Sequence, residues 1–444
     1  MKALNALDRR FALTAHGTTV RTELLAGLTT FLTMAYIVFV QPAVLSAAGM
    51  DFGAVLVATC VATALATTLM ALMANYPIAV APAMGHNFFF AYSVVLAMRV
   101  PWPIALGAVA LAGIVFVLTA GIGLREHLIT AIPQSLKYAI AAGIGLLIAM
   151  IGLQWAGLIV GAPGTLVALG NLRGRPVLLA LFGLTVTAIL TARKIPGAFL
   201  WGILSTTVIG LLIGVVHYQG FVSVPPSIRP TLFRLDIVGA LSPSMITVVL
   251  VFFFLALFDS VGTLVGVGEQ AGLMRNGTLP RARQALLADA LGTVAGAALG
   301  TSTVTAYIES GAGVAAGGRT GLASLVTAAL FVLSLFAYPL VRMIGGGVTV
   351  GQATLYPVIA APLILVGTMM IGGLRHVAWD DPTEGIPAFL TLIMMPLSVS
   401  ITEGVAFGLI SYVVLKVASG RSRDVHALLY VFALLFVARY AFLR

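Results

Sequence analysis

Two acidic side chains lie within long apolar stretches of the sequence, where a charged group is costly. Asp259 stands in FFFLALFDSVGTLVGV (252–267), and Glu309 stands in GTSTVTAYIESGAG (300–313). An ionised side chain in the middle of a membrane costs at least about 2.5 to 3.5 kcal/mol, so such a residue needs a functional reason. A carboxyl group there can alternate between a protonated hydrogen-bond donor and an ionised acceptor. This property suits proton coupling and recognition of a ring with adjacent N–H and C=O groups.

A second set of candidates lies in APAMGHNFFFA (81–91). Asn87 offers a donor and an acceptor, which suits the edge of a planar base and Asp259 equally well. His86 is either a packed interior histidine, the reading that we favour, or a group that titrates near neutral pH in a wet cavity. Phe88 and its two neighbours could supply one stacking face for a planar ligand.

Both candidate regions interrupt the helical pattern. Pro82 and Gly85 break the first, and Gly300 with a β-branched run breaks the second. Non-helical backbone at membrane depth is tolerated only where protein or a water-lined cavity satisfies its polar groups. We therefore expect residues 301–305 to form a short strand-like piece that brings Thr305 to a cavity. Half-helices opening there would point their N–H groups at the substrate.

The remaining motifs predict no enzyme and no metal site. Asp289 and Glu403 lie near predicted segment ends and are interpreted as structural or capping residues. The fragment DDPTE (380–384) has no second acidic cluster to complete a metal clamp and is predicted to be a solvated loop. No HExxH, GxSxG or Walker A motif is present. Cys60 is the single cysteine, which excludes an intramolecular disulfide.

The composition is that of a polytopic membrane protein. Hydrophobic residues make up 60% of the 444, charged residues make up 9%, and the mean hydropathy is +1.10. Ordinary soluble domains carry about 25% charged residues. The net charge of +10 is spread over loop ends, which indicates membrane topology and not nucleic-acid binding. Fourteen spans of about 20 residues would use most of the chain.

Apolar runs divide the chain into seven plus seven segments. We predict them near 24–48, 54–74, 79–97, 101–124, 136–158, 176–192, 197–216, 245–267, 285–299, 302–317, 321–344, 352–373, 385–398 and 401–417. The first is too long for a signal-peptide core, so the N-terminus is retained. A cytoplasmic N-terminus places most Lys and Arg residues, Arg125 among them, on the inner side. The apolar tail at 426–442 is interpreted as an interfacial helix and not as a fifteenth span.

An odd number of segments in each half predicts an inverted repeat. Asn87 and Glu309 are 222 residues apart (309 minus 87), and Gln41 and Asp259 are 218 apart (259 minus 41). Both separations are close to half the chain length. They favour a duplicated architecture.

Several motifs, in order along nearly the whole chain, resemble one transporter family. They are GLTTFLTMAYIVFVQPAVL (27–45), APAMGHNFFFAY (81–92), LKYAIAAGIGLLIAMIGLQWAGLIV (136–160), FDSVGTLVGV (258–267), TSTVTAYIESGAGVAAGGRTGL (301–322) and IPAFLTLIMMPLSVSITEGVAFG (386–408). The family is the nucleobase cation symporters of the nucleobase/ascorbate type, in the adenine/guanine/hypoxanthine permease branch. The resemblance implies fourteen segments in two inverted repeats, a core and a gate domain, dimers and proton-coupled uptake of purine bases. It carries substrate-site roles to Asn87, Asp259 and Glu309.

Three positions depart from the pattern of the branch. Ala256 stands where an aspartate is common, three residues before Asp259, so one polar group is missing. His86 replaces a leucine and could restore part of that function, and Gln41 replaces an asparagine. These departures leave the fold and transporter class unchanged but bear on which base is carried and on proton stoichiometry.

The combined interpretation is an all-α membrane protein of the bacterial inner membrane, with short extended stretches in the interrupted segments at 79–97 and 302–317. It imports purine nucleobases with protons, without another cofactor. The expected partners are the purine, membrane lipid and a second copy of the chain, with no nucleic acid. The expected site residues are Asp259, Glu309, Asn87, His86, Phe88 and Thr305, with Glu309 and Asp259 also coupling the proton. The alternatives are a carrier of the same fold for uracil, xanthine or a small anion, and, remotely, a membrane-embedded enzyme. The expected parts are a cytoplasmic tail (1–23), core (24–135 and 245–344), gate (136–217 and 352–417) and C-terminal tail (418–444).

Overall fold

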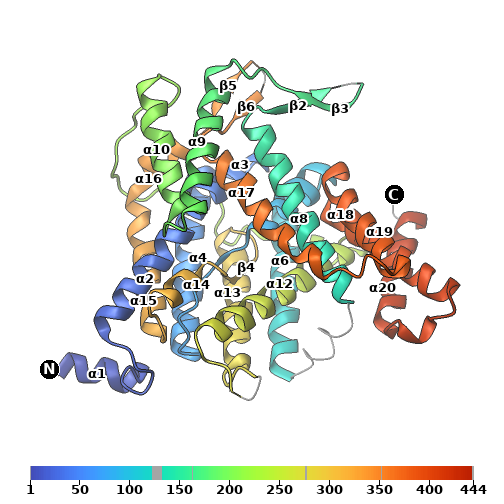
Figure 1. Cartoon of the computed structure of the whole chain (residues 1–444), viewed down its shortest axis with the longest axis horizontal. Coiled ribbons are helices and arrows are strands. Elements are labelled where there is room, and N and C mark those ends of the chain that lie inside the picture. The colour runs from blue at the N-terminus through green and yellow to red at the C-terminus, as the bar shows by residue number, and fades with distance from the viewer. Residues whose placement is uncertain (1, 123–132, 163, 276–277, 352, 443–444) are drawn as a thin grey trace.

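The computed structural model describes residues 2–122, 133–162, 164–275, 278–351 and 353–442, and most of them are helical (Figure 1). The elements are α1 (Lys2–Phe11), α2 (Val20–Met34), α3 (Ile37–Ala47), α4 (Phe52–Met73), β1 (Val80–Pro82), α5 (Met84–Phe88), the π-helix η1 (Phe89–Ala97), α6 (Trp102–Ile122), α8 (Gln134–Trp155), β2 (Ile159–Ala162), β3 (Leu166–Leu169), α9 (Arg175–Ala192), α10 (Ala198–Leu212), α11 (Ile237–Ala240), α12 (Pro243–Gln270), α13 (Ala282–Leu299), β4 (Val304–Ala306), α14 (Ser310–Ala315), α15 (Gly321–Ser334), η2 (Leu335–Ala337), α16 (Tyr338–Gly345), β5 (Val348–Val350), β6 (Ala353–Leu355), α17 (Ala360–Ile371), η3 (Gly372–His376), α18 (Pro382–Ser398), α19 (Ile401–Ala418), η4 (Ser422–Asp424) and α20 (Ala427–Phe442).

The mostly helical membrane architecture is confirmed. Within the described ranges, eight helical stretches are long and apolar enough to cross a membrane. Shorter apolar helices add to these, among them Met84–Ala97, Ala198–Leu212 and Ala360–His376. The predicted end of the fourth segment at residue 124, and Arg125, lie outside the described residues.

Some predicted segments differ from the helices. The segment at 24–48 is two helices, α2 and α3, which meet at residues 35–36. In the segment at 352–373, β6 precedes α17, which begins only at Ala360. Strands were expected only in the segments at 79–97 and 302–317, and that expectation was incomplete because β2–β3 and β5–β6 form two further hairpins. The consecutive β-branched residues Val348, Thr349 and Val350 favour strand β5, and Gly351, whose φ is +61°, suits the turn that follows it.

The helices pack as two groups that are interleaved along the sequence. One group contains α2, α3, α4, α6, α12, α13 and α15. Each of these helices contacts at least one other member of the group; α13, for example, packs against α4 and α6. The other contains α8, α9, α10, α17, α18 and α19. Figure 1 shows α1 at one side of the molecule and α18 to α20 at the opposite side. Contacts of α12 with α19 and of α2 with α10 join the two groups.

Small residues allow the helices to approach closely, as in the pair α9 and α10. A side-chain carbon added at Gly202 would lie 2.0 Å from Thr187 Oγ1, and one added at Gly183 would lie 2.6 Å from Thr206 Oγ1. Each threonine hydroxyl donates to a carbonyl of its own helix, at 2.7 Å. Because lipid removes the hydrophobic drive for helix association, such close packing must hold the helices together.

Replacing Gly313 of α14 by alanine is expected to destabilise the fold. The new methyl group would lie 2.0 Å from Thr30 Oγ1 and 2.6 Å from the Ala26 carbonyl oxygen of α2. Overpacking of this kind costs about 1 to 3 kcal/mol. Thermal unfolding of the detergent-purified protein should show a lower midpoint. Gly262→Ala is the matched control, since nothing lies within 4 Å of its added carbon, and an equal loss in both variants would contradict the packing argument.

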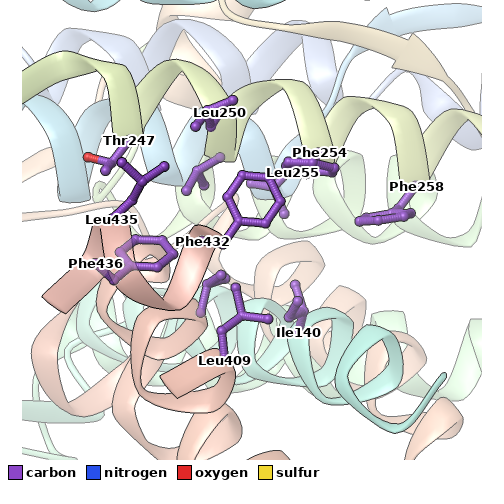
Figure 2. A pocket seen from close by; sticks show the side chains of 12 residues that line it. Ile140, Thr247, Leu250, Phe254, Leu255, Phe258, Leu409, Phe432, Leu435 and Phe436 are labelled. Atoms are coloured by element: carbon purple, nitrogen blue, oxygen red, sulfur yellow. The ribbon is translucent and has the colours of Figure 1, made fainter. Parts of the chain in front are cut away.

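The C-terminal helix α20 packs against α12 and α19. Arg439 Nη2 lies 3.0 Å from Glu403 Oε1, and the Tyr440 hydroxyl donates to Glu403 Oε2. Phe432 meets Phe254 of α12 edge to face, with ring centroids 5.0 Å apart. Figure 2 shows α12 and α20 on facing sides of an apolar cavity of about 40 Å³. Glu403, predicted to be structural, thus anchors α20 to α19.

The acidic fragment 380–384 is not simply a solvated loop, because its carboxylates form ion pairs. The buried Lys416 Nζ lies 2.8 Å from Glu384 Oε1 and 3.8 Å from Asp381 Oδ2. Arg421 Nη1 lies 2.7 Å from the same Asp381 oxygen, and Asp381 also accepts hydrogen bonds from Thr383. The fragment therefore joins the start of α18 to the end of α19.

This cluster predicts a loss of stability at acidic pH. Hydrogen bonds from Arg421 and Thr383 hold the pKa of the Asp381 carboxyl well below its usual range. A depressed pKa contributes stability above the unfolded-state pKa of about 3.9, and this stability is lost as the pH falls towards the folded-state pKa. In Arg421→Gln the difference between the two pKa values should shrink. Unfolding midpoints measured from pH 7 to pH 3 should therefore fall less steeply for the variant than for the wild type, and parallel curves would contradict the assignment.

Candidate functional site

A two-stranded antiparallel pairing lies where the two interrupted segments meet. Strand β1 pairs with β4, with Ala81 opposite Thr305. Beyond the strands, the Ala83 N–H donates to the Thr303 carbonyl oxygen at 3.0 Å, and the Tyr307 N–H donates to that of Ala79 at 2.9 Å. The two segments thus satisfy each other's backbone, as membrane depth requires. The predicted strand-like piece is confirmed and centres on residues 304–306.

Each strand is hydrogen-bonded through its backbone to one threonine of a neighbouring helix. Thr67 of α4 donates to the Val80 carbonyl oxygen at 3.0 Å and accepts from the Val80 N–H at 3.0 Å. Thr293 of α13 donates to the Val304 carbonyl oxygen at 2.7 Å. The two threonines are 226 residues apart in sequence (293 minus 67), and the two strand residues that they contact are 224 apart (304 minus 80). Both values are close to the 222 residues between Asn87 and Glu309 and the 218 between Gln41 and Asp259.

Asp259 lies on α12 facing strand β4. Thr305 Oγ1 donates to Asp259 Oδ2 at 3.0 Å. The Asp259 side chain is exposed, whereas its neighbours Leu257 and Ser260 are buried. One carboxylate is therefore positioned by a strand hydroxyl and remains accessible to a ligand.

Glu309 follows β4 and stands directly before α14. The Tyr36 hydroxyl donates to Glu309 Oε1 at 2.8 Å. Tyr36 is buried at the break between α2 and α3, and its ring meets Phe199 of α10 edge to face at 5.3 Å. Glu309 is half-buried and follows Thr305, the hydrogen-bond partner of Asp259, by four residues. The two predicted carboxyl groups thus belong to one site.

The sequence analysis missed Tyr36. The available signal was a hydroxyl-bearing ring in the apolar run 35-AYIVFV-40, because a buried tyrosine usually needs a hydrogen-bond partner. Its contact with Phe199 links Glu309 to a helix of the other packing group.

Asn87 lies in a buried polar network. Ser302 Oγ donates to Asn87 Oδ1, and Gln41 Nε2 donates to Thr301 Oγ1 at 2.9 Å and to Ser302 Oγ at 3.2 Å. Asn87, Gln41 and Ser302 are each 0% exposed. In this conformation Asn87 joins α5 to the segment before β4. It does not present its amide to an open cavity.

His86 and Phe88 are buried on either side of Asn87. The His86 ring lies against the main chain of Leu255 on α12. The Phe88 ring stacks on Tyr92 with centroids 5.6 Å apart and lies 6.3 Å from Trp155 of α8. One Phe88 face is therefore occupied by protein in this conformation.

Asp289 is closer to the site than its position near a segment end indicated. It is fully buried on α13, and Ser260 Oγ donates to its Oδ2. Ser260 directly follows Asp259 on α12, so this hydrogen bond joins Asp289 to the helix that carries Asp259. Ala256, one turn earlier on α12, is buried and brings no polar group. In the described part of the chain, no cluster of three or more His, Cys, Asp or Glu residues could hold a metal ion.

The geometry therefore places two partly accessible carboxyl groups, Asp259 and Glu309, beside the short sheet formed by β1 and β4. Known proteins resemble the chain over nearly its whole length. Residues 21–407 match the model of a family described as the permease family. The chain is 47% identical to adenine permease AdeP of Escherichia coli over 438 residues, covering 98% of this chain and 96% of that protein. It is 44% identical to guanine/hypoxanthine permease PbuG of Bacillus subtilis over 440 residues, covering 96% and 98%.

A solved structure shares the fold at low sequence identity. It is the transmembrane domain of a cyanobacterial bicarbonate transporter, BicA, with a TM-score of 0.63 and 19% identity. The match covers 86% of this chain and 97% of that domain. The arrangement of helices is thus shared with a solved transporter.

Proposed function

Since this chain belongs to the permease family, we propose that it imports purine nucleobases in symport with protons. The chain is a transporter and not an enzyme. The single observation that carries the proposal is that Asp259 accepts a hydrogen bond from Thr305 of β4, while Glu309, four residues after Thr305, accepts one from Tyr36. Relatives named for adenine and for guanine/hypoxanthine support a purine as substrate.

Asp259 and Glu309 hold the ring edge, and one of them carries the proton. An ionised carboxylate accepts from ring N–H groups, and a protonated one donates to a ring nitrogen or carbonyl. One proton moving inward down about 100 mV supplies about 2.3 kcal/mol, enough for about 50-fold accumulation of a neutral base. Thr305 and Tyr36 orient the carboxyl groups.

Transport proceeds by alternating access between two domains. The core comprises 24–135 and 245–344, and the gate comprises 136–217 and 352–417. The two interleaved packing groups support this division. The paired β1 and β4, with their threonine braces from α4 and α13, support an inverted repeat of seven plus seven segments.

The proposed setting is the inner membrane, with a cytoplasmic N-terminus, α20 lying at the membrane interface and two copies forming a dimer. The distribution of Lys and Arg supports the orientation.

A same-fold carrier of a small anion is the second candidate, suggested by the shared fold of the bicarbonate transporter. An anion would favour a cationic site, whereas the residues around β1 and β4 supply Asp259 and Glu309.

Thermal unfolding of the detergent-purified chain with added bases tests the substrate class. Adenine, guanine and hypoxanthine should raise the midpoint at pH 5.5 or pH 7.5, and bicarbonate should not. Uracil and xanthine serve as competing candidates. Stabilisation by bicarbonate alone would overturn the proposal, and stabilisation by uracil or xanthine alone would exclude adenine, guanine and hypoxanthine.

A further inference from the structure

A polar cavity of about 640 Å³ lies away from the two carboxyl groups, at the ends of several helices. Its wall comes from the turn after α1, the end of α4, the loop between α12 and α13, and the segment after α14. The residues that line it include His16, Tyr76, Arg275, Arg281 and Arg319. Cavities that hold small molecules are typically about 300 to 1,000 Å³.

The three arginines of this cavity, Arg275, Arg281 and Arg319, give it a positive charge that no carboxylate of the described residues neutralises in an ion pair. None of the three guanidinium groups forms an ion pair within the described part of the chain. Glu23 is nearby, but its Oε1 accepts from the main-chain N–H of Arg319 at 2.8 Å and not from the guanidinium. Among the described residues that line the cavity, none is Asp or Glu. The charge around it is therefore available to an anion.

Two of the arginines are held in place before any ligand binds. Arg319 Nη1 donates to the carbonyl oxygens of Val314 and Gly318, each at 2.7 Å. Arg281 Nη1 donates to the Ala74 carbonyl oxygen at 3.2 Å. These bonds use one nitrogen of each guanidinium and leave further N–H groups to bind oxygen atoms. A planar guanidinium matches phosphate oxygens in a bidentate geometry.

We propose that this cavity, the arginine pocket, binds a phosphate-bearing anion with two or more negative charges. Three guanidinium groups exceed what one singly charged anion needs, and the volume exceeds that of one phosphate group. In the proposed orientation the pocket opens to the cytoplasm. The source is either a soluble phosphate compound or the head group of an anionic lipid, since the chemistry is shared. Because the pocket joins the ends of α4 and α12 to the segment after Glu309, its ligand would brace the elements that carry the site.

Binding of sodium pyrophosphate to the full chain in neutral detergent, measured by calorimetry, tests the proposal for a soluble ligand. Arg275→Gln should weaken binding at least about tenfold, because a charge-assisted hydrogen bond is lost. Arg275 is the first choice, since it is exposed and its side chain donates no hydrogen bond within the described part of the chain. Arg283→Gln is the matched control, because it removes the same charge two residues from Arg281 without lining the pocket.

Nanodiscs distinguish the lipid source. If the ligand is a lipid head group, phosphatidylglycerol added to phosphatidylcholine nanodiscs should raise the unfolding midpoint of the wild type and of Arg283→Gln, but not of Arg275→Gln. Either a pyrophosphate signal or a lipid signal with this dependence supports the pocket. Absence of both signals, or an equal effect of Arg275→Gln and Arg283→Gln, would overturn the proposal. Both readouts are independent of nucleobase transport.

Discussion

Glu309→Gln is expected to abolish proton-driven accumulation of purine bases. Glutamine can still bond to Tyr36, whose hydroxyl lies 2.8 Å from Glu309 Oε1, but it cannot take up or release a proton. In proteoliposomes with an inward proton gradient and about 100 mV, accumulation of adenine or hypoxanthine should fall from about 50-fold to about 1-fold.

The control for this variant is Glu269→Gln, which removes the same charge from the exposed end of α12. It should accumulate base like the wild type. Unfolding midpoints of both variants establish that they are folded. Accumulation by Glu309→Gln within twofold of the wild type would remove Glu309 from the coupling mechanism.

Asp259→Asn is expected to lower the affinity for the base by about 10- to 150-fold. This range corresponds to the loss of a hydrogen bond to a charged group, about 1.5 to 3 kcal/mol. The asparagine side chain can still meet Thr305 but carries no charge. Thr305→Val, which leaves the charge and removes only the donor, should cost less, because a neutral hydrogen bond contributes about 1 kcal/mol.

Equilibrium binding of radiolabelled adenine and hypoxanthine to purified protein measures these affinities. Asp380→Asn is the matched control, since Asp380 is exposed in the loop before α18. An affinity of Asp259→Asn equal to that of Asp380→Asn would place the substrate elsewhere. If Thr305→Val weakened binding as strongly as Asp259→Asn, the strand hydroxyl, and not the carboxylate, would be the main contact.

The buried network around Asn87 explains why a residue can matter without facing the ligand. Gln41, Ser302 and Asn87 join α3, α5 and the segment before β4, which are distant in sequence. A buried polar group left unpaired costs about 1 to 3 kcal/mol. A change at any of these residues would therefore shift the strands that position Asp259 and Glu309.

The sequence by itself determined the membrane class, most helix positions and the two interrupted segments. These properties are local, since hydropathy, glycine and proline act on their own stretch of chain. The isolated acidic residues Asp259 and Glu309 were identifiable for the same reason, because a carboxyl group in an apolar run stands out without knowledge of its neighbours.

The tertiary structure alone decided which groups meet. Tyr36 reaches Glu309 across 273 residues, and Ser302 reaches Asn87 across 215. The arginine pocket likewise gathers side chains from four separate stretches of chain. No periodicity in a single segment encodes such contacts, because they depend on how closely packed helices bring distant loops and strands together.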